Sequence, residues 1–163
     1  MIHEHGRHRS ILFVCTGNIF RSLAAEQAFK VLLGPSPSYL VGSAGIDAKP
    51  QPIHDWVKTR LSKYGCDPSS HVQRQLTSEM VEKADLIISM GRNHQEFLRE
   101  RFGRDVPLYN QVCCDRDEPI LDIHEVMPAW EESPDRARAY VWSVIDQIWE
   151  RMPALISRLR FFG

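Results

Sequence analysis

Short apolar runs alternate along the chain with longer stretches in which apolar residues recur at three- and four-residue spacing. The short runs have the length and the apolar content of buried strands, and the longer stretches have the periodicity of amphipathic helices. Strands are predicted at residues 11–15, 39–44, 85–90 and 106–109. Helices are predicted at residues 22–33, 53–64, 77–83 and 93–102, and a last helix is predicted from residue 133 onwards.

The last predicted helix and the segment before it carry less regular signals. Residues 110–132 match neither period and are predicted to be irregular. Ser133 followed by Pro134 is typical of a helix start, because serine caps the first turn and proline fits its first position. Pro153 is expected to kink or break this helix before residues 155–159.

The alternation of strands and helices predicts an α/β fold with three layers, in which helices cover both faces of a four-stranded parallel sheet. Residues 10–163 are expected to form a single domain behind a flexible polar tail at residues 1–9. Ligands of such sheets bind at the carboxyl ends of the strands. Cys15 ends the first predicted strand, so it lies where a ligand is expected.

Charge and cysteine content narrow the classes of function. The 163 residues carry a formal net charge of -1, so neither nucleic acid nor a membrane is an expected partner. No apolar run reaches the roughly 18 residues of a membrane span, and residues 1–9 lack the apolar core of a secretory signal. We expect a cytoplasmic protein with reduced thiols and without metal or cofactor, because the cysteine spacing fits neither a zinc site nor a disulfide framework. The cysteines are Cys15, Cys66, Cys113 and Cys114.

The chemistry of the chain is concentrated between Cys15 and Ser22, where the first strand passes through a tight loop into a helix. Backbone N–H groups of such a loop and of the helix N-terminus form a cradle for an anion. The same surroundings favour the thiolate form of Cys15, which can attack phosphorus and form a covalent thiophosphate. Arg21 offers a planar guanidinium that grips two phosphate oxygens.

Three other residues of this loop have predicted roles. Gly17 allows close backbone approach and a positive φ, and Asn18 tolerates a left-handed conformation while its side chain ties the loop down. Ser22 is expected to lie within reach of the thiolate and to stabilise the sulfur when the intermediate is hydrolysed. The predicted phosphate-binding residues are Thr16, Gly17, Asn18, Ile19, Phe20, Arg21 and Ser22.

The run Val-Cys-Thr-Gly-Asn-Ile-Phe-Arg-Ser at residues 14–22 resembles the signature of the low-molecular-weight protein tyrosine phosphatases. Further similar segments extend the likeness from residue 11 to residue 159; they lie at residues 43–45, 65–76 and 84–90. The resemblance implies a phosphatase I-like, Rossmann-like fold. It also implies hydrolysis of phosphotyrosine in proteins through a cysteinyl-phosphate intermediate. A phosphorylated protein or an aryl phosphate is then the expected partner of a monomer or weak dimer. By the same resemblance, His71 joins Asn18 and Ser22 in a hydrogen-bond network that supports the loop.

The chain departs from the family pattern at two functional positions. Phe20 stands where the family usually has a second cysteine, so the disulfide that shields the nucleophile from over-oxidation cannot form there. The family's general acid is an aspartate followed by proline on the loop directly before the last helix, and no such pair occurs in residues 110–132. Alignment of the local sequence places Glu125 at the acid position, with Asp122 as the alternative.

The residues that flank the substrate also differ from the family. Residues 49–52 lack the aromatic side chain that would stack on the phosphotyrosine ring. Trp130 is the predicted replacement, and Trp56 is a further candidate.

Two other functions stay open at this level. One is a thiol-dependent arsenate reductase, although none of the other cysteines lies just beyond the third strand, where that class keeps its resolving pair. The other is a module that binds phosphorylated partners without hydrolysing them, because the acid loop is altered.

Overall fold

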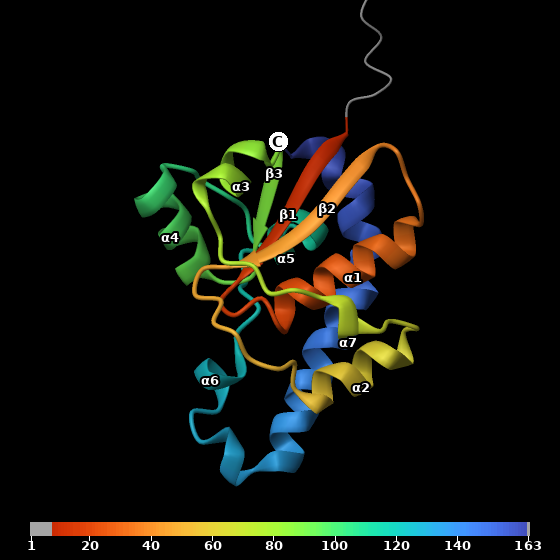
Figure 1. Ribbon diagram of the computed structural model, residues 1–163, viewed down its shortest axis with the longest axis vertical. Helices are drawn as coiled ribbons and strands as arrows, with labels where there is room; N and C mark the ends of the chain where they lie inside the picture. Colours follow the sequence, from red (N-terminus) through yellow and green to blue (C-terminus); the bar gives the residue numbers. More distant parts are fainter. Residues whose placement is uncertain (1–7, 163) are drawn as a thin grey trace, which may run out of the picture.

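Three parallel strands form the centre of the molecule, in the order β2-β1-β3. The computed structural model describes residues 8–162. The strands are β1 Arg9–Cys15, β2 Tyr39–Gly45 and β3 Leu86–Ser89. β1 is paired along both sides, since Cys15 lies opposite Gly45 of β2 and Val14 lies opposite Ser89 of β3. The carboxyl end of β1 is therefore enclosed between its neighbours (Figure 1).

Helices cover both faces of the sheet, as predicted. The helices are α1 Arg21–Leu33, α2 Asp55–Lys63, α3 Ser78–Lys83, α4 Arg92–Phe102, α5 Tyr109–Cys114, α6 Ile123–Val126 and α7 Pro134–Arg158. Short 3-10 turns occur at η1 Pro68–Ser70, η2 Trp130–Glu132 and η3 Leu159–Phe161. Figure 1 shows α3 and α4 on one side of the sheet and α1, α5 and α7 on the other.

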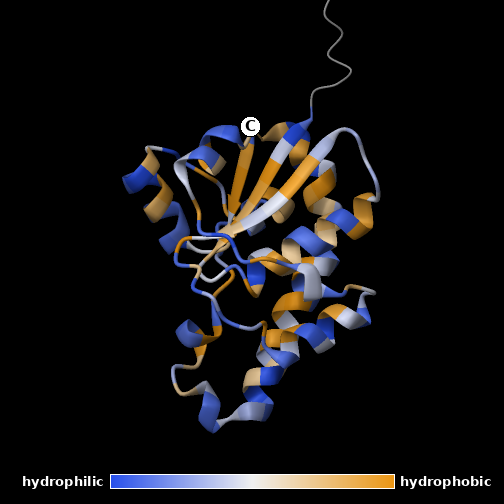
Figure 2. Cartoon of the chain, in the orientation of Figure 1, coloured by the Kyte–Doolittle hydropathy of each residue, from blue (hydrophilic) through white to orange (hydrophobic). Residues whose placement is uncertain are grey.

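Successive side chains of β1 point to opposite faces and build two separate clusters. Ile11, Phe13 and Cys15 pack with residues of α1, α5 and α7. Leu12 and Val14 pack with residues of α3 and α4 in the second cluster. This alternation follows from the two-residue period of a strand, and burial on both faces explains why β1 reads as an unbroken apolar run. Figure 2 shows the hydrophobic residues concentrated in the strands and on the helix faces that turn toward them.

The predicted fourth strand is not formed in the described part of the chain. A single bridge between Ser89 and Leu108 stands in its place, and α5 begins at Tyr109. Pro107 accepts a hydrogen bond from the Ser89 N–H through its carbonyl oxygen (3.0 Å) but has no N–H of its own. A ladder cannot extend past a residue without a donor when the chain turns into a helix two residues later.

Both ends of the chain also differ from the sequence-based predictions. Arg9 belongs to β1 rather than to a tail, since its N–H donates to Ser38 O (2.9 Å) and its Nη1 donates to Leu159 O (2.6 Å). His8 is exposed and belongs to no element, and residues 1–7 of the predicted tail lie outside the described residues. Pro153 does not break the last helix, which runs from Pro134 to Arg158. Packing explains this continuity, because Met152 and Leu155 on either side of the proline are fully buried.

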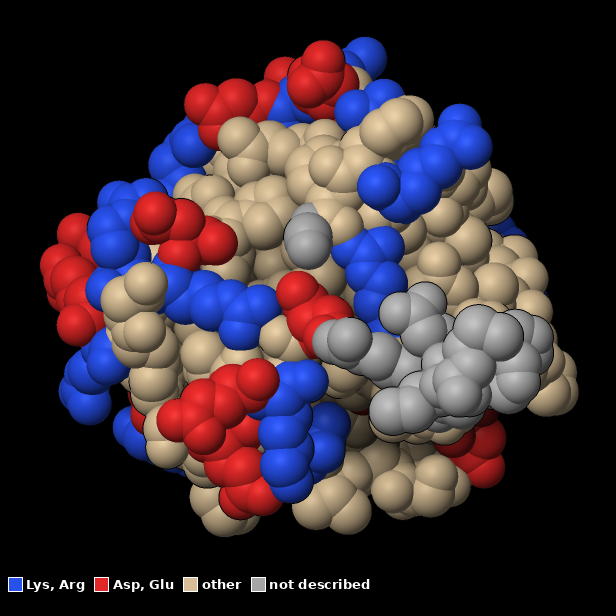
Figure 3. All heavy atoms as spheres, turned by 90° about the horizontal axis from the view of Figure 1, so that it is seen from above, with Lys and Arg blue, Asp and Glu red and all other residues tan. Residues whose placement is uncertain are grey.

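The face seen in Figure 3 carries no large region of a single charge sign among the described residues. Acidic and basic side chains are interspersed over the part of this face that the undescribed residues leave visible. Within residues 8–162, no helix combines the length and the hydrophobicity that crossing a membrane would need.

Candidate active site

The loop at residues 16–20 connects β1 to α1 at the carboxyl edge of the sheet (Figure 1). The carbonyl oxygens of Cys15 and Thr16 accept hydrogen bonds from Ile46 N (3.0 Å) and Asp47 N (2.9 Å). The backbone N–H groups of residues 17–20 have no protein acceptor among the described residues. α1 also begins without a side-chain cap, so the donors of its first turn are open to a ligand. The loop and the helix start together form the predicted anion cradle.

Cys15 and Ser22 face each other across this loop. The Cys15 Sγ lies 2.9 Å from the Ser22 Oγ, and both residues are buried. Asn18 Nδ2 donates to the same Ser22 oxygen at 3.0 Å. Because the Ser22 oxygen accepts from Asn18, its own proton is free to be donated to the sulfur. The contact predicted for Ser22 is therefore present, with the polarity that stabilises a thiolate.

Asn18 is the residue that shapes the loop. It is fully buried and adopts a left-handed conformation with φ 58°. Its Nδ2 donates to Ser43 Oγ (2.8 Å) as well as to Ser22, and its Oδ1 accepts from Arg74 N (3.0 Å). His71 Nε2 lies 2.7 Å from the Asn18 carbonyl oxygen. The structure thus brings Asn18, Ser22 and His71 together, as the sequence-based network requires.

The support of the loop continues into the body of the protein. Ser43 of β2 donates its hydroxyl proton to Glu26 Oε1 at 2.6 Å, and the other oxygen of Glu26 pairs with Lys30 at 2.6 Å. The Ser43 oxygen is therefore left as an acceptor for Asn18. This chain connects α1, β2 and the loop through side chains that lie far apart in the sequence.

Gly45 is needed for the loop to approach β2, and the sequence analysis assigned it no such role. A Cβ at this position would lie 2.4 Å from the Thr16 carbonyl oxygen and 3.0 Å from the Asn18 N. Gly17, in contrast, does not adopt the positive φ predicted for it. A Cβ at Gly17 would meet nothing closer than 3.4 Å. The left-handed residue of the loop is Asn18.

Arg21 is buried with its charge unpaired. Its side chain is 1% exposed, and it forms no salt bridge with a carboxylate of the described residues. Nη1 donates to the Ile120 carbonyl oxygen at 2.7 Å, and Nε has no hydrogen-bond partner. A buried cation without a counterion is unfavourable, so this arrangement favours binding of an anion.

Cys15 and Arg21 line a pocket of about 400 Å³. Asp47, Lys49, Asp122 and His124 contribute polar groups to its rim, and Ile19 and Phe20 contribute apolar surface. Trp130 and Trp56 line it with ring centroids 5.8 Å apart, and His54 contacts both rings, at 5.9 Å and 4.2 Å. The sequence predicts both tryptophans at the site but not His54, since a histidine before a helix carries no distinctive signal.

The two candidate acids occupy different surroundings. Asp122 lines the pocket with Cys15, whereas Glu125 is not among the residues that line it. The Glu125 carboxylate instead accepts from the Asp122 N–H at 3.0 Å and caps the first turn of α6. This capping contact directs the Glu125 side chain to the helix start, so of the two candidate acids Asp122 is the one that lines the cavity.

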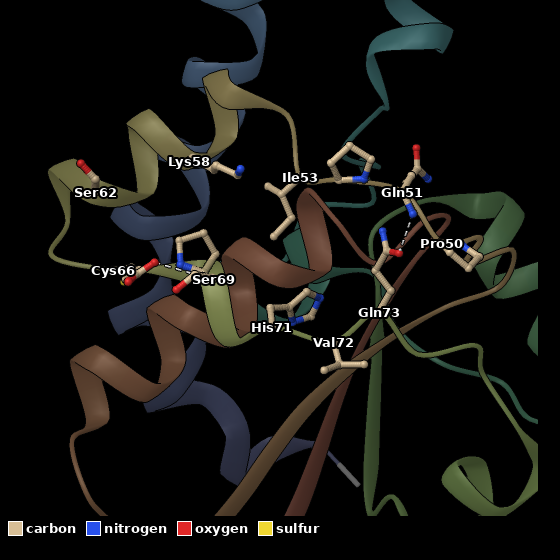
Figure 4. A pocket seen from close by; sticks show the side chains of 13 residues that line it. Pro50, Gln51, Ile53, Lys58, Ser62, Cys66, Ser69, His71, Val72 and Gln73 are labelled. Atoms are coloured by element: carbon tan, nitrogen blue, oxygen red, sulfur yellow. Dashed lines mark hydrogen bonds between the residues drawn. The ribbon is translucent and has the colours of Figure 1, made fainter.

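A second hollow of about 740 Å³ adjoins the first and shares Gln51 and Pro52 with it (Figure 4). Its walls include Cys66 and His71. Burial raises the pKa of the Cys66 thiol, so at neutral pH this sulfur is protonated and a poor nucleophile. The reactive groups of the described residues therefore lie in the smaller pocket. No cluster of three or more His, Cys, Asp or Glu in residues 8–162 is arranged to hold a metal ion.

Replacing Gly45 with alanine tests the close approach between β2 and the loop. We expect Gly45→Ala to lower the free energy of unfolding by about 1–3 kcal/mol, because the new methyl group overlaps backbone atoms that cannot move aside. Gly17→Ala is the matched control, and we expect a change below about 0.5 kcal/mol. Urea denaturation of both variants measures the difference. Equal effects at the two positions would contradict the geometric argument.

Comparison with known proteins identifies the family to which this chain is similar. The family model described as "Low molecular weight phosphotyrosine protein phosphatase" matches residues 10–124. A protein-arginine-phosphatase of Bacillus subtilis is 36% identical over 97 residues, which cover 58% of this chain and 63% of that protein. The low molecular weight protein-tyrosine-phosphatase Ptp of Acinetobacter johnsonii is 32% identical over 93 residues, 56% of this chain and 63% of the relative. The matches thus span less than two thirds of these curated relatives.

Solved structures are similar over nearly the whole chain. A mutant of the arginine phosphatase YwlE with a phosphorylated active-site serine superposes with a TM-score of 0.78 and 26% identity, covering 93% of this chain and 95% of that one. A low molecular weight protein tyrosine phosphatase from T. tengcongensis superposes with a TM-score of 0.74 and 25% identity, covering 92% and 99%. The matching family model, the shared fold and the Cys15–Ser22 loop show that this chain belongs to the low-molecular-weight protein tyrosine phosphatase family.

Proposed function

We propose that this protein hydrolyses phosphate monoesters, with phosphotyrosine in proteins as the substrate, through a cysteinyl-phosphate intermediate. The observation that carries the proposal is the unpaired charge of Arg21 beside Cys15 in one pocket, above a loop whose N–H groups have no protein acceptor. Such a site has the donors and the positive charge that bind a phosphoryl dianion.

In the first step the Cys15 thiolate attacks phosphorus, so that an S–P bond forms and the bond between phosphorus and the phenolic oxygen breaks. Arg21 and the N–H groups of the loop stabilise the charge on the equatorial oxygens. The leaving oxygen takes a proton from a carboxylic acid. In the second step the resulting carboxylate takes a proton from water as the water oxygen attacks phosphorus, so that an O–P bond forms, the S–P bond breaks and the acid is restored. The Ser22 hydroxyl, 2.9 Å from the sulfur, then stabilises the departing thiolate.

Asp122 is the proposed proton donor. It lines the same pocket as Cys15, which gives its carboxyl group access to the leaving oxygen. Glu125, which sequence alignment favours, has its carboxylate engaged 3.0 Å from the Asp122 N–H. Capping by Glu125 supports the turn that presents Asp122, so Glu125 has a structural role in this proposal.

The walls of the pocket favour an aromatic phosphate ester. The rings of Trp130, Trp56 and His54 lie against one another, and Ile19 adds apolar surface to the pocket. A phenyl ring gains from stacking with such rings. Relatives of this chain carry the names of tyrosine phosphatases and of arginine phosphatases. The choice of phosphotyrosine therefore rests on the aromatic walls of the pocket rather than on these names.

The cysteines give little support to a thiol-dependent reductase. Such an enzyme needs a second thiol that can attack an adduct on Cys15. Burial raises the pKa of Cys66, and it raises the pKa of Cys113 to about 12, so both thiols are protonated at neutral pH. Cys66 lines the neighbouring hollow, and neither Cys113 nor Cys114 lines the pocket of Cys15.

Steady-state hydrolysis of 4-nitrophenyl phosphate tests the proposed function. We expect the parent protein to release 4-nitrophenolate and Cys15→Ser to lose the activity by roughly four or more orders of magnitude, because the nucleophile is removed. Acid quenching during turnover, followed by mass spectrometry, should find phosphate on the peptide that contains Cys15. A parent protein that binds aryl phosphates without releasing product would point instead to a phosphate-binding module.

The choice between the two acids is tested by the leaving group. Phenolate is a poor leaving group that needs a proton, whereas 4-nitrophenolate needs it much less. We expect Asp122→Asn to lower kcat on phenyl phosphate by about 10²–10⁴-fold, with a smaller loss on 4-nitrophenyl phosphate. Glu125→Gln is the matched control and should keep the same ratio of the two rates as the parent. The opposite result would assign the proton to Glu125.

Removing the Trp130 ring tests the proposed aromatic substrate. We expect Trp130→Ala to raise KM for a phosphotyrosine peptide about two- to twelvefold, since stacking of aromatic rings contributes about 0.5–1.5 kcal/mol. A small alkyl phosphate assayed with the same variant serves as the control and should show little change. Faster hydrolysis of a phosphoarginine peptide than of a phosphotyrosine peptide by the parent would contradict the proposed substrate.

A further inference from the structure

His94 contacts the active-site loop from inside the protein. It lies in the first turn of α4, next to the end of β3, and its side chain is fully buried. Its Nε2 lies 2.9 Å from the Thr16 Oγ1, and its Nδ1 accepts from the Gly91 N–H at 2.8 Å. The turn between β3 and α4 lies beside the loop that follows β1 (Figure 1). One imidazole ring therefore connects this turn to the residue after the nucleophile.

The direction of the hydrogen bond to Thr16 follows from the partner of the other ring nitrogen. A backbone N–H can only donate, so Nδ1 carries no proton. Burial, helped by the nearby Arg21 charge, lowers the pKa of His94 to about 3, and the ring is neutral near pH 7. A neutral imidazole without a proton on Nδ1 carries it on Nε2. Nε2–H therefore donates to the Thr16 Oγ1.

The hydroxyl proton of Thr16 must then point elsewhere. Its oxygen already accepts from His94, and among the described residues the hydroxyl has no acceptor for its own proton. Thr16 lines the same pocket as Cys15 and Arg21. His94 fixes the Thr16 hydroxyl oxygen from the protein side, and within residues 8–162 the hydroxyl proton has no protein acceptor. This proton is therefore directed into the pocket, where an oxygen atom of a ligand would lie.

We propose that Thr16 donates its hydroxyl proton to a phosphoryl oxygen bound in the pocket, and that His94 is the positioning residue that holds this hydroxyl in the donating orientation. The inference deepens the proposed function, on which it rests for the identity of the anion. The Thr16 hydroxyl thus adds a side-chain donor to the backbone N–H groups of the loop. Its orientation is set by His94, which belongs to α4. His94 itself does not line the pocket.

Binding of inorganic phosphate, measured by isothermal titration calorimetry near pH 7, tests the role of Thr16. We expect Thr16→Val, which keeps the shape but lacks the hydroxyl, to weaken phosphate binding roughly ten- to a hundredfold, since a hydrogen bond to a charged group is lost. Thr16→Ser is the matched control. It keeps the hydroxyl and should bind phosphate within about threefold of the parent.

A second pair of variants tests the positioning role of His94. The amide nitrogen of Gln reaches about as far as Nε2, whereas the shorter Asn ends near the position of Nδ1. We expect His94→Gln to retain most of the phosphate affinity and His94→Asn to lose it about three- to tenfold, because an unheld hydroxyl rotates freely. Adding His94→Asn to Thr16→Val should cause no further loss, since both changes remove the same donor. Thermal unfolding of each variant confirms that the comparison is between folded proteins.

Three results would overturn the inference. They are equal phosphate affinity of Thr16→Val and Thr16→Ser, additive losses in the double variant, and absence of phosphate binding to the parent. Because phosphate binding is measured without turnover, the outcome is independent of catalysis. A protein that fails to hydrolyse aryl phosphates but shows the expected pattern would refute the proposed function and support the role of Thr16 and His94.

Discussion

The site depends on a single buried residue held in a left-handed conformation. Asn18 turns the chain between β1 and α1 with φ 58°, and its side chain reaches Ser22, Ser43 and the Arg74 N–H. A left-handed conformation is unfavourable for most residues, so the surrounding hydrogen bonds must maintain it. With this turn in place, the N–H groups of the loop are left without protein partners and are available to an anion. The left-handed turn at Asn18 and the capacity of the loop to bind an anion are therefore coupled.

Electrostatics and burial act together in the pocket. Arg21 is buried and has no carboxylate partner among the described residues, so binding of an anion would neutralise its charge. Because Arg21 is buried, solvent screens this attraction only weakly. Burial also raises the pKa of Cys66 and Cys113, so these two thiols are protonated at neutral pH.

The loop is supported by residues from several separate elements. Gly45 of β2 permits its close approach, His71 contacts the Asn18 carbonyl oxygen, and His94 of α4 holds Thr16. Parallel pairing makes this possible, since it brings the carboxyl ends of neighbouring strands to one edge of the sheet. Each support is a short hydrogen bond or a steric contact, so the position of the loop is fixed by the packed fold rather than by its own sequence.

The sequence by itself determined the features that depend on neighbouring residues. The strand at residues 11–15, the loop, the start of α1 and the pairing of Cys15 with Ser22 follow from local periodicity, turn chemistry and helix geometry. Tertiary structure decided what depends on distant contacts. It replaced the fourth strand by a bridge at Leu108, carried α7 through Pro153, and put Asp122 in the pocket while Glu125 capped α6. It also revealed Gly45 and His94, because close approach and burial are properties of the packed molecule that no local pattern records.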